Sequence, residues 1–186
     1  MAEIPAQPVF FYDLASPGCY LAAERVMSAL PVVPEWEPVL GARIGAGWPE
    51  PDRSDLVRRA IEAELQPLRW PAAWPLDSEL AMLAATYAKR VGRAVAFSLA
   101  AFRQVFAGGR DLGEGTVLLA AAACEMHPTA LLKGITLRSV TTGLDEAGKR
   151  AVAAGVKTLP AIQVGAGLFE GDRAVEQAGA ALALSR

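Results

Sequence analysis

The hydrophobic pattern of this chain changes its period twice, and this change limits the folds open to it. Near the start, Val9-Phe10-Phe11-Tyr12 is a continuous apolar run of aromatic and β-branched residues, typical of a buried strand. From Ser54 to about Gly155 the period is helical almost throughout. At Ala161-Ile162-Gln163-Val164 the pattern of a strand returns. We therefore expect strands near both ends of the chain and helices between them.

A helix is expected directly after the first strand. Ser16-Pro17 is a strong helix start, because serine is a favoured N-cap and proline is favoured at the first helical position. This helix should end before Pro31. The segment 32–40 then has the character of a second strand, and Pro34 and Pro38 favour a place at a sheet edge.

The last part of the chain predicts a hairpin and a closing helix. The turn Gly165-Ala166-Gly167 separates the strand 161–164 from a further strand that begins at Leu168. Asp172 can cap a helix over 173–184. The predicted order is therefore β-α-β, then a helical block, then α-β-β-α, in an α/β fold.

The middle of the chain is predicted to be an all-helical insertion. The glycine- and proline-rich segment 41–53 is expected to be a loop. Helices are expected over 80–91, 97–106 and 117–124, from Pro128 onward, and over 144–154. We accordingly assign 1–44 and 146–186 to one domain and 45–145 to the helical insertion domain.

Composition excludes several classes of function. The formal net charge is −2 and no basic stripe is visible, so nucleic acid is not an expected partner. The apolar runs are too short to span a membrane, and the N-terminus lacks the pattern of a secretory signal. With only two cysteines, Cys19 and Cys124, a cytoplasmic location is expected, although a mature chain without its signal would look the same.

The chemistry is concentrated where the first strand meets the first helix. Ser16 stands at a helix N-terminus, where free backbone N–H groups and the helix dipole favour an anion. A thiolate at this position is stabilised, and thiol oxidoreductases place the first cysteine of a Cys-X-X-Cys motif there. In this chain the same spacing is Ser-X-X-Cys, ending at Cys19.

The pattern Ser-Pro-X-X-Tyr-Leu after an aromatic strand resembles 2-hydroxychromene-2-carboxylate isomerases and kappa-class glutathione transferases of the DsbA-like superfamily. The resemblance implies a thioredoxin-like fold with a helical insertion. It extends over most of the chain, through the segments 16–21, 69–75, 102–112, 155–160 and 171–173. Gly18 and Cys19 depart from it, since the family commonly has an aromatic residue or a serine there.

The resemblance also implies a cofactor and a set of site residues. Ser16 would hydrogen-bond the thiol of bound glutathione and favour its thiolate. Leu159 would pair its backbone with the cysteinyl part of glutathione, and Pro160 would follow a cis peptide bond facing Ser16. Asp172 would meet the γ-glutamyl end. The implied substrate is a small, partly aromatic electrophile, and a homodimer is compatible with the sequence.

Other interpretations stay open at this stage. Ser16 can be a helix cap without a catalytic role, and Cys19 can be a buried apolar residue. If Cys19 is reactive, the chain would be a DsbA-like thiol–disulfide oxidoreductase; a non-catalytic ligand-binding descendant is the third interpretation. No metal site is predicted, because Cys124 and His127 are only two candidate ligands. The single histidine also disfavours a Ser-His-Asp hydrolase.

Overall fold

The computed structural model of the chain describes residues 7–46 and 50–184. Within these residues a four-stranded sheet has the order β2-β1-β3-β4, from strands β1 (Val9–Tyr12), β2 (Glu35–Pro38), β3 (Ala161–Val164) and β4 (Gly167–Glu170). Strand β1 is parallel to β2 and antiparallel to β3, and β3 and β4 form the predicted hairpin. The proline-containing strand β2 lies at a sheet edge, as predicted.

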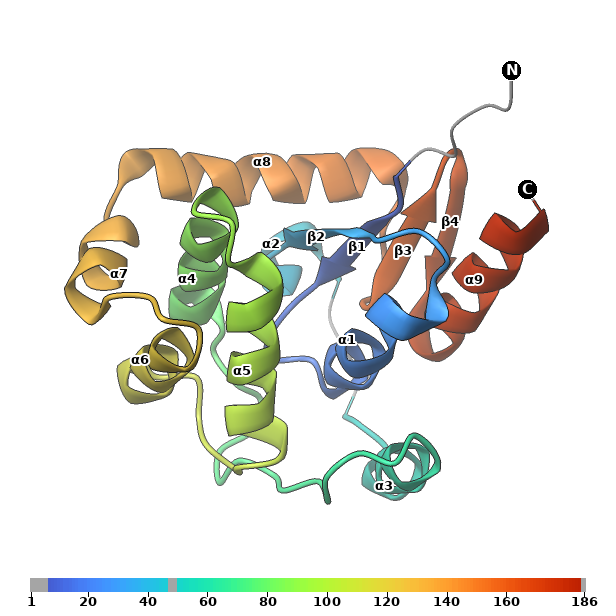
Figure 1. Cartoon of the computed structure of the whole chain (residues 1–186), viewed down its shortest axis with the longest axis horizontal. Helices are drawn as coiled ribbons and strands as arrows, with labels where there is room; N and C mark the ends of the chain where they lie inside the picture. The colour runs from blue at the N-terminus through green and yellow to red at the C-terminus, as the bar shows by residue number, and fades with distance from the viewer. Residues whose placement is uncertain (1–6, 47–49, 185–186) are drawn as a thin grey trace.

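Helices cover both sides of this sheet and extend beyond it (Figure 1). The helical elements are α1 (Pro17–Ala29), α2 (Gly41–Ile44), α3 (Arg53–Glu62), α4 (Glu79–Arg90), α5 (Ala94–Phe106), α6 (Glu114–Ala123), α7 (Pro128–Gly134), α8 (Arg138–Ala154), the 3₁₀ turn η1 (Gly171–Arg173) and α9 (Ala174–Leu184). Helices α1 and α9 pack on each other, and α8 runs along the opposite side of the sheet beside α2 and β2. The remaining helices, α3 to α7, belong to the insertion between β2 and β3. This α/β arrangement is a thioredoxin-like fold with a helical insertion, which confirms the predicted fold class.

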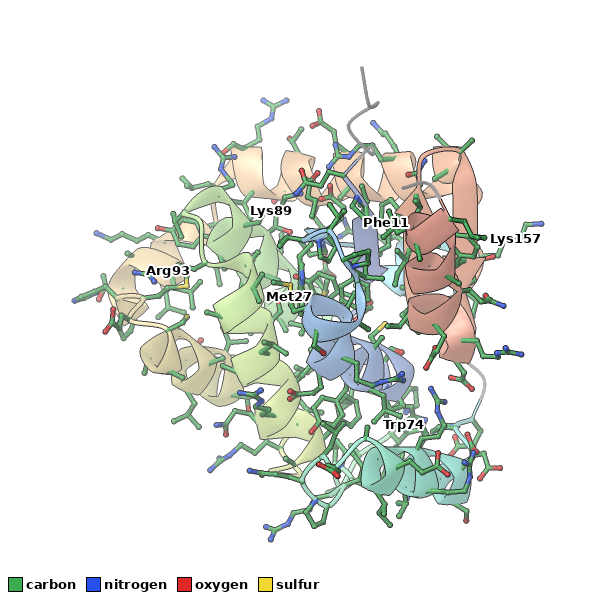
Figure 2. The ribbon with its side chains drawn as sticks, turned by 45° about the vertical axis from the view of Figure 1, so that its right-hand side comes forward. Phe11, Met27, Trp74, Lys89, Arg93 and Lys157 are labelled. Carbon is green, nitrogen blue, oxygen red and sulfur yellow. The ribbon has the colours of Figure 1, made fainter. Side chains whose placement is uncertain are left out.

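Strand β1 is buried on both faces and lies at the centre of the core. Phe10 and Tyr12 point to one face, where their rings stack and Trp36 packs edge-on against both. Phe11 points to the other face and lies in the interior of the molecule (Figure 2). The Tyr12 hydroxyl hydrogen-bonds the buried Ser98 hydroxyl of α5 over 2.7 Å. The strand that leads to Ser16 is therefore fixed by the sheet and by the insertion together.

Several predicted boundaries were wrong, among them the start of α5, which lies at Ala94 rather than 97. The segment 41–44, expected to be a loop, forms the short helix α2, which Gly45 ends in a left-handed conformation with φ 69°. Helix α6 begins at Glu114 rather than 117. Helix α8 begins at Arg138 rather than 144, because Val140 is buried one turn before Leu144 within an otherwise polar stretch. The predicted division at residue 145 thus falls inside α8, and the two-domain assignment stays a prediction.

Candidate functional site

Ser16 caps helix α1. Its backbone is extended, with φ −89° and ψ 119°, and its Oγ accepts a hydrogen bond from the Cys19 N–H over 3.2 Å. The Ser16 N–H donates to the Asp13 carbonyl over 3.1 Å. The predicted capping role is thereby confirmed. Pro17 lacks an N–H and the Cys19 N–H already donates to Ser16, so the anion-binding character of this helix end depends on the Gly18 N–H and the helix dipole.

Three loops from distant parts of the sequence meet around Gly18. The Leu159-Pro160 peptide bond is cis, as predicted. A Cβ atom placed on Gly18 would lie 3.3 Å from Pro160 Cδ, 3.7 Å from Ser16 Oγ and 3.8 Å from Asp172 Oδ1. The four residues named as site residues from the resemblance, Ser16, Leu159, Pro160 and Asp172, are thus gathered at one end of α1.

A cleft of about 260 Å³ opens beside Ser16. Its walls come from the start of α1, from the loop before Pro160, from Gly171 and Asp172, and from the first part of α3. Helix α3 supplies Asp55, Leu56 and Arg59 to the wall facing Ser16. The cleft therefore lies between the thioredoxin-like part and the first helix of the insertion, a usual location for a ligand site.

The loop before Pro160 is held by Glu170, which sequence reasoning missed. The Glu170 Oε1 accepts hydrogen bonds from the backbone N–H groups of Lys157 and Thr158 over 2.6 and 2.7 Å. The Lys157 side chain itself points outward (Figure 2). The Gly171 N–H donates to the Pro160 carbonyl over 2.8 Å, and its φ of 74° is a conformation that favours glycine. Glu170 and Gly171 thus fix the loop opposite Ser16.

Asp172 is not the cap of α9, contrary to the prediction. It lies in η1, and its Oδ1 is 2.6 Å from a guanidinium nitrogen of Arg59 on α3. Arg59 also donates to the Asp172 carbonyl over 3.4 Å, across 113 positions of sequence. The Asp172 carboxylate thus pairs with a cation of the insertion. No local sequence signal indicates the pair.

Cys19 is fully buried, which supports its interpretation as an apolar core residue. Burial raises the pKa of its thiol to about 12, and hydrogen bonding with Ser16 offsets only part of this increase. A thiol with such a pKa is almost entirely protonated at neutral pH, so it is a poor nucleophile. Cys124 is also buried and forms no disulfide.

Asp13 is a buried carboxylate beneath the Ser16 loop. Its two oxygens accept hydrogen bonds from the N–H groups of Ala15 over 2.9 Å and Gly41 over 2.8 Å. These bonds join the turn before α1 to the turn after β2. Burial raises the pKa of the Asp13 carboxyl to about 6, although the hydrogen bonds act in the opposite direction. Asp13 therefore positions the loop that carries Ser16.

The remaining candidates lie away from the cleft. His127 caps α7, with its Nδ1 accepting from the Thr129 N–H over 3.2 Å, as expected for a residue of an interhelical turn. Among the residues that the structure describes, no group of three or more His, Cys, Asp and Glu side chains could hold a metal ion. Within the same residues, no helix combines the length and the apolar character needed to cross a membrane.

Several solved structures are similar to this one over most of the chain. No protein-family model and no curated protein sequence matches the chain. The structure of 2-hydroxychromene-2-carboxylate isomerase is similar with a TM-score of 0.84 and 20% identity, covering 95% of this chain and 94% of that one. A probable DsbA oxidoreductase from Streptomyces coelicolor is similar with a TM-score of 0.76 and 16% identity, over 96% and 89% of the two chains. The cytosolic disulfide reductase DsbM from Pseudomonas aeruginosa with GSH is similar with a TM-score of 0.63 and 14% identity, over 96% of each chain.

The sheet order, the cis proline facing the start of α1 and the helical insertion define a DsbA-like thioredoxin fold. Within that class, the structure of this chain resembles 2-hydroxychromene-2-carboxylate isomerase over almost its whole length.

Gly18 is expected to limit what fits beside Ser16. We expect Gly18→Ala to reduce ligand affinity severalfold with little effect on the fold, because the new methyl group would crowd Pro160 at 3.3 Å and reach toward Asp172. Calorimetric titration with glutathione and thermal unfolding of both proteins check this. Gly115→Ala is the matched control, since its Cβ would meet no atom within 4 Å. Equal affinities for wild type and Gly18→Ala would contradict the role given to Gly18.

Proposed function

We propose that this chain is a glutathione-dependent isomerase or transferase that acts on a small, partly aromatic electrophile. The observation that carries the proposal is the meeting of Ser16, the cis Pro160 loop and Asp172 around the cleft beside α1. The similarity to an isomerase structure and to a reductase structure with GSH supports it. A cytoplasmic location, where glutathione is reduced, fits this function.

The residues of the cleft fit a peptide thiol by their chemistry. Bound glutathione would supply the nucleophilic thiolate. Ser16 would hold that thiolate through its hydroxyl, together with the Gly18 N–H at the start of α1. Leu159 would present its backbone to the peptide part, at the place where Glu170 fixes the loop. Asp172 would pair with the γ-glutamyl ammonium.

A calorimetric titration with glutathione tests the proposal, and we expect binding at or below millimolar concentration. S-methylglutathione is the matched ligand, since it keeps the peptide but cannot form a thiolate. We expect it to bind more weakly, and we expect Asp172→Asn to weaken both ligands alike. If neither glutathione nor S-methylglutathione binds at millimolar concentration, the proposal is refuted, and a ligand-binding role of another kind is left.

The oxidoreductase interpretation makes a different prediction for Cys19. A dithiol exchange cycle needs an attacking thiolate and a resolving thiol, whereas Cys19 is buried and its thiol has a pKa of about 12. We therefore expect no acceleration of insulin reduction by dithiothreitol above the uncatalysed rate, with no difference between wild type and Cys19→Ala. Robust turnover that Cys19→Ala abolishes would establish the oxidoreductase instead.

A further inference from the structure

Arg59 forms an ion pair with Asp172, the carboxylate that we propose for the ligand ammonium. Its guanidinium lies 2.6 Å from Asp172 Oδ1 and 3.7 Å from Asp55 Oδ2. The Arg59 side chain is only 16% exposed, whereas the Asp172 side chain is 62% exposed. Arg59 is therefore the more buried member of the pair, and the Asp172 carboxylate is the member that solvent can reach.

The surroundings of Arg59 also give it a second partner. Asp55 lies one helical turn before Arg59 on α3, within reach of the same guanidinium. The hydrogen bond from Arg58 lowers the pKa of the Asp55 carboxyl, so this carboxylate stays ionised at neutral pH. Arg59 can thus release Asp172 and still keep an anionic partner.

Arg59 further separates two hollows of the surface. One is the cleft beside Ser16, and the other is a polar hollow of about 390 Å³ that Arg25, Arg173 and Glu176 help to form. Asp55, Arg59 and Asp172 line both. A turn of the Arg59 side chain from Asp172 to Asp55 would therefore leave the Asp172 carboxylate free at the cleft without a movement of the backbone.

From this geometry we infer that Arg59 is a specificity-determining residue that competes with the ligand ammonium for Asp172. The inference depends on the proposed function, because it takes the ammonium of a γ-glutamyl group as the competing cation. A ligand pairs with Asp172 only when Arg59 turns to Asp55. Ligands without a cationic end gain nothing from this exchange, so the pair discriminates between ligands by the charge of their ends.

The test compares glutathione affinities at low ionic strength by calorimetry. Arg59→Met keeps the aliphatic stem of a mostly buried side chain and removes the charge. We expect it to bind glutathione about fivefold more tightly than wild type, the effect of removing one competing ion pair. Arg59→Lys should stay close to wild type. Arg25→Met is the matched control: it removes a cation of the same hollow that pairs with Glu176, and should leave the affinity unchanged.

A double-mutant cycle assigns the effect to Asp172. In the Asp172→Asn background, Arg59→Met should give no gain, because no carboxylate is left to release. Thermal unfolding of each variant verifies that it is folded. If wild type binds glutathione but Arg59→Met binds it equally or more weakly, the inference is overturned while the proposed function stands. If none of the proteins binds glutathione, both are refuted; binding by Arg59→Met alone would support both.

Discussion

Ser16→Ala is expected to raise the pKa of the thiol of bound glutathione by about one to two units. A hydrogen bond to a charged group contributes about 1.5–3 kcal/mol, and 1.36 kcal/mol corresponds to one pKa unit. The folded protein should be retained, since loss of an N-cap costs only about 1 kcal/mol. Ultraviolet absorbance of the bound thiolate across a pH series measures the change.

Two variants make this experiment specific to the Ser16 hydroxyl. Ser16→Thr keeps a hydroxyl at the helix end and should stay near the wild-type thiolate pKa. Ser28→Ala removes an exposed hydroxyl from the last turns of the same helix and should have no effect. The same thiolate pKa in wild type and Ser16→Ala would mean that Ser16 is only a helix cap.

Asp13→Asn should change how the free energy of unfolding depends on pH. The Asp13 carboxyl has a pKa of about 6 in the folded protein against an ordinary value of 3.8, so between these pH values the folded state holds a proton that the unfolded chain has lost. The stabilisation that comes from this bound proton is present in full only well below pH 3.8 and is lost as the pH rises through 6. The full loss in the free energy of unfolding is about 3 kcal/mol, and Asp13→Asn should not show it because asparagine does not titrate.

Urea unfolding at several pH values from 4 to 7 measures this difference. Wild type should lose about 2 kcal/mol of stability relative to Asp13→Asn over that range, since part of the full loss already occurs below pH 4. A constant offset is also expected, because the asparagine amide would face the N–H of Ala15 or Gly41 without an acceptor. Glu125→Gln, at a highly exposed carboxylate, is the control and should follow wild type. Parallel profiles for wild type and Asp13→Asn would show that Asp13 titrates as in the unfolded chain.

Those parts of the site that depend on local pattern could be predicted from the sequence. The buried strand before Ser16, the serine-proline helix start and the final hairpin each have a signal within a few residues, and the structure has all three. The cis bond before Pro160 follows from resemblance alone and is present. The second cis bond, Trp74-Pro75, was not predicted, because most X-Pro bonds in folded proteins are trans.

The contacts that the sequence does not predict are those between distant segments. Arg59 meets Asp172 across 113 positions, and Asp13 meets Gly41 across 28. Each partner alone looks like an ordinary surface charge or turn residue. The local sequence of Asp172 permits a helix cap and does not reveal Arg59, which is why the cap prediction was wrong. Glu170 gives a weak signal only, through its position next to Gly171-Asp172.

The buried bond between Tyr12 and Ser98 has a consequence for how the chain can be divided. Tyr12 ends the strand that leads to Ser16, and its ring also lies 6.0 Å from the ring of Phe102 on α5. A shortened chain without residues 45–145 would lose Ser98 and Phe102, and the apolar rings of Phe10 and Tyr12 on that face of β1 would be exposed to water. We therefore expect the thioredoxin-like part not to fold on its own, because its central strand packs against the insertion on one face.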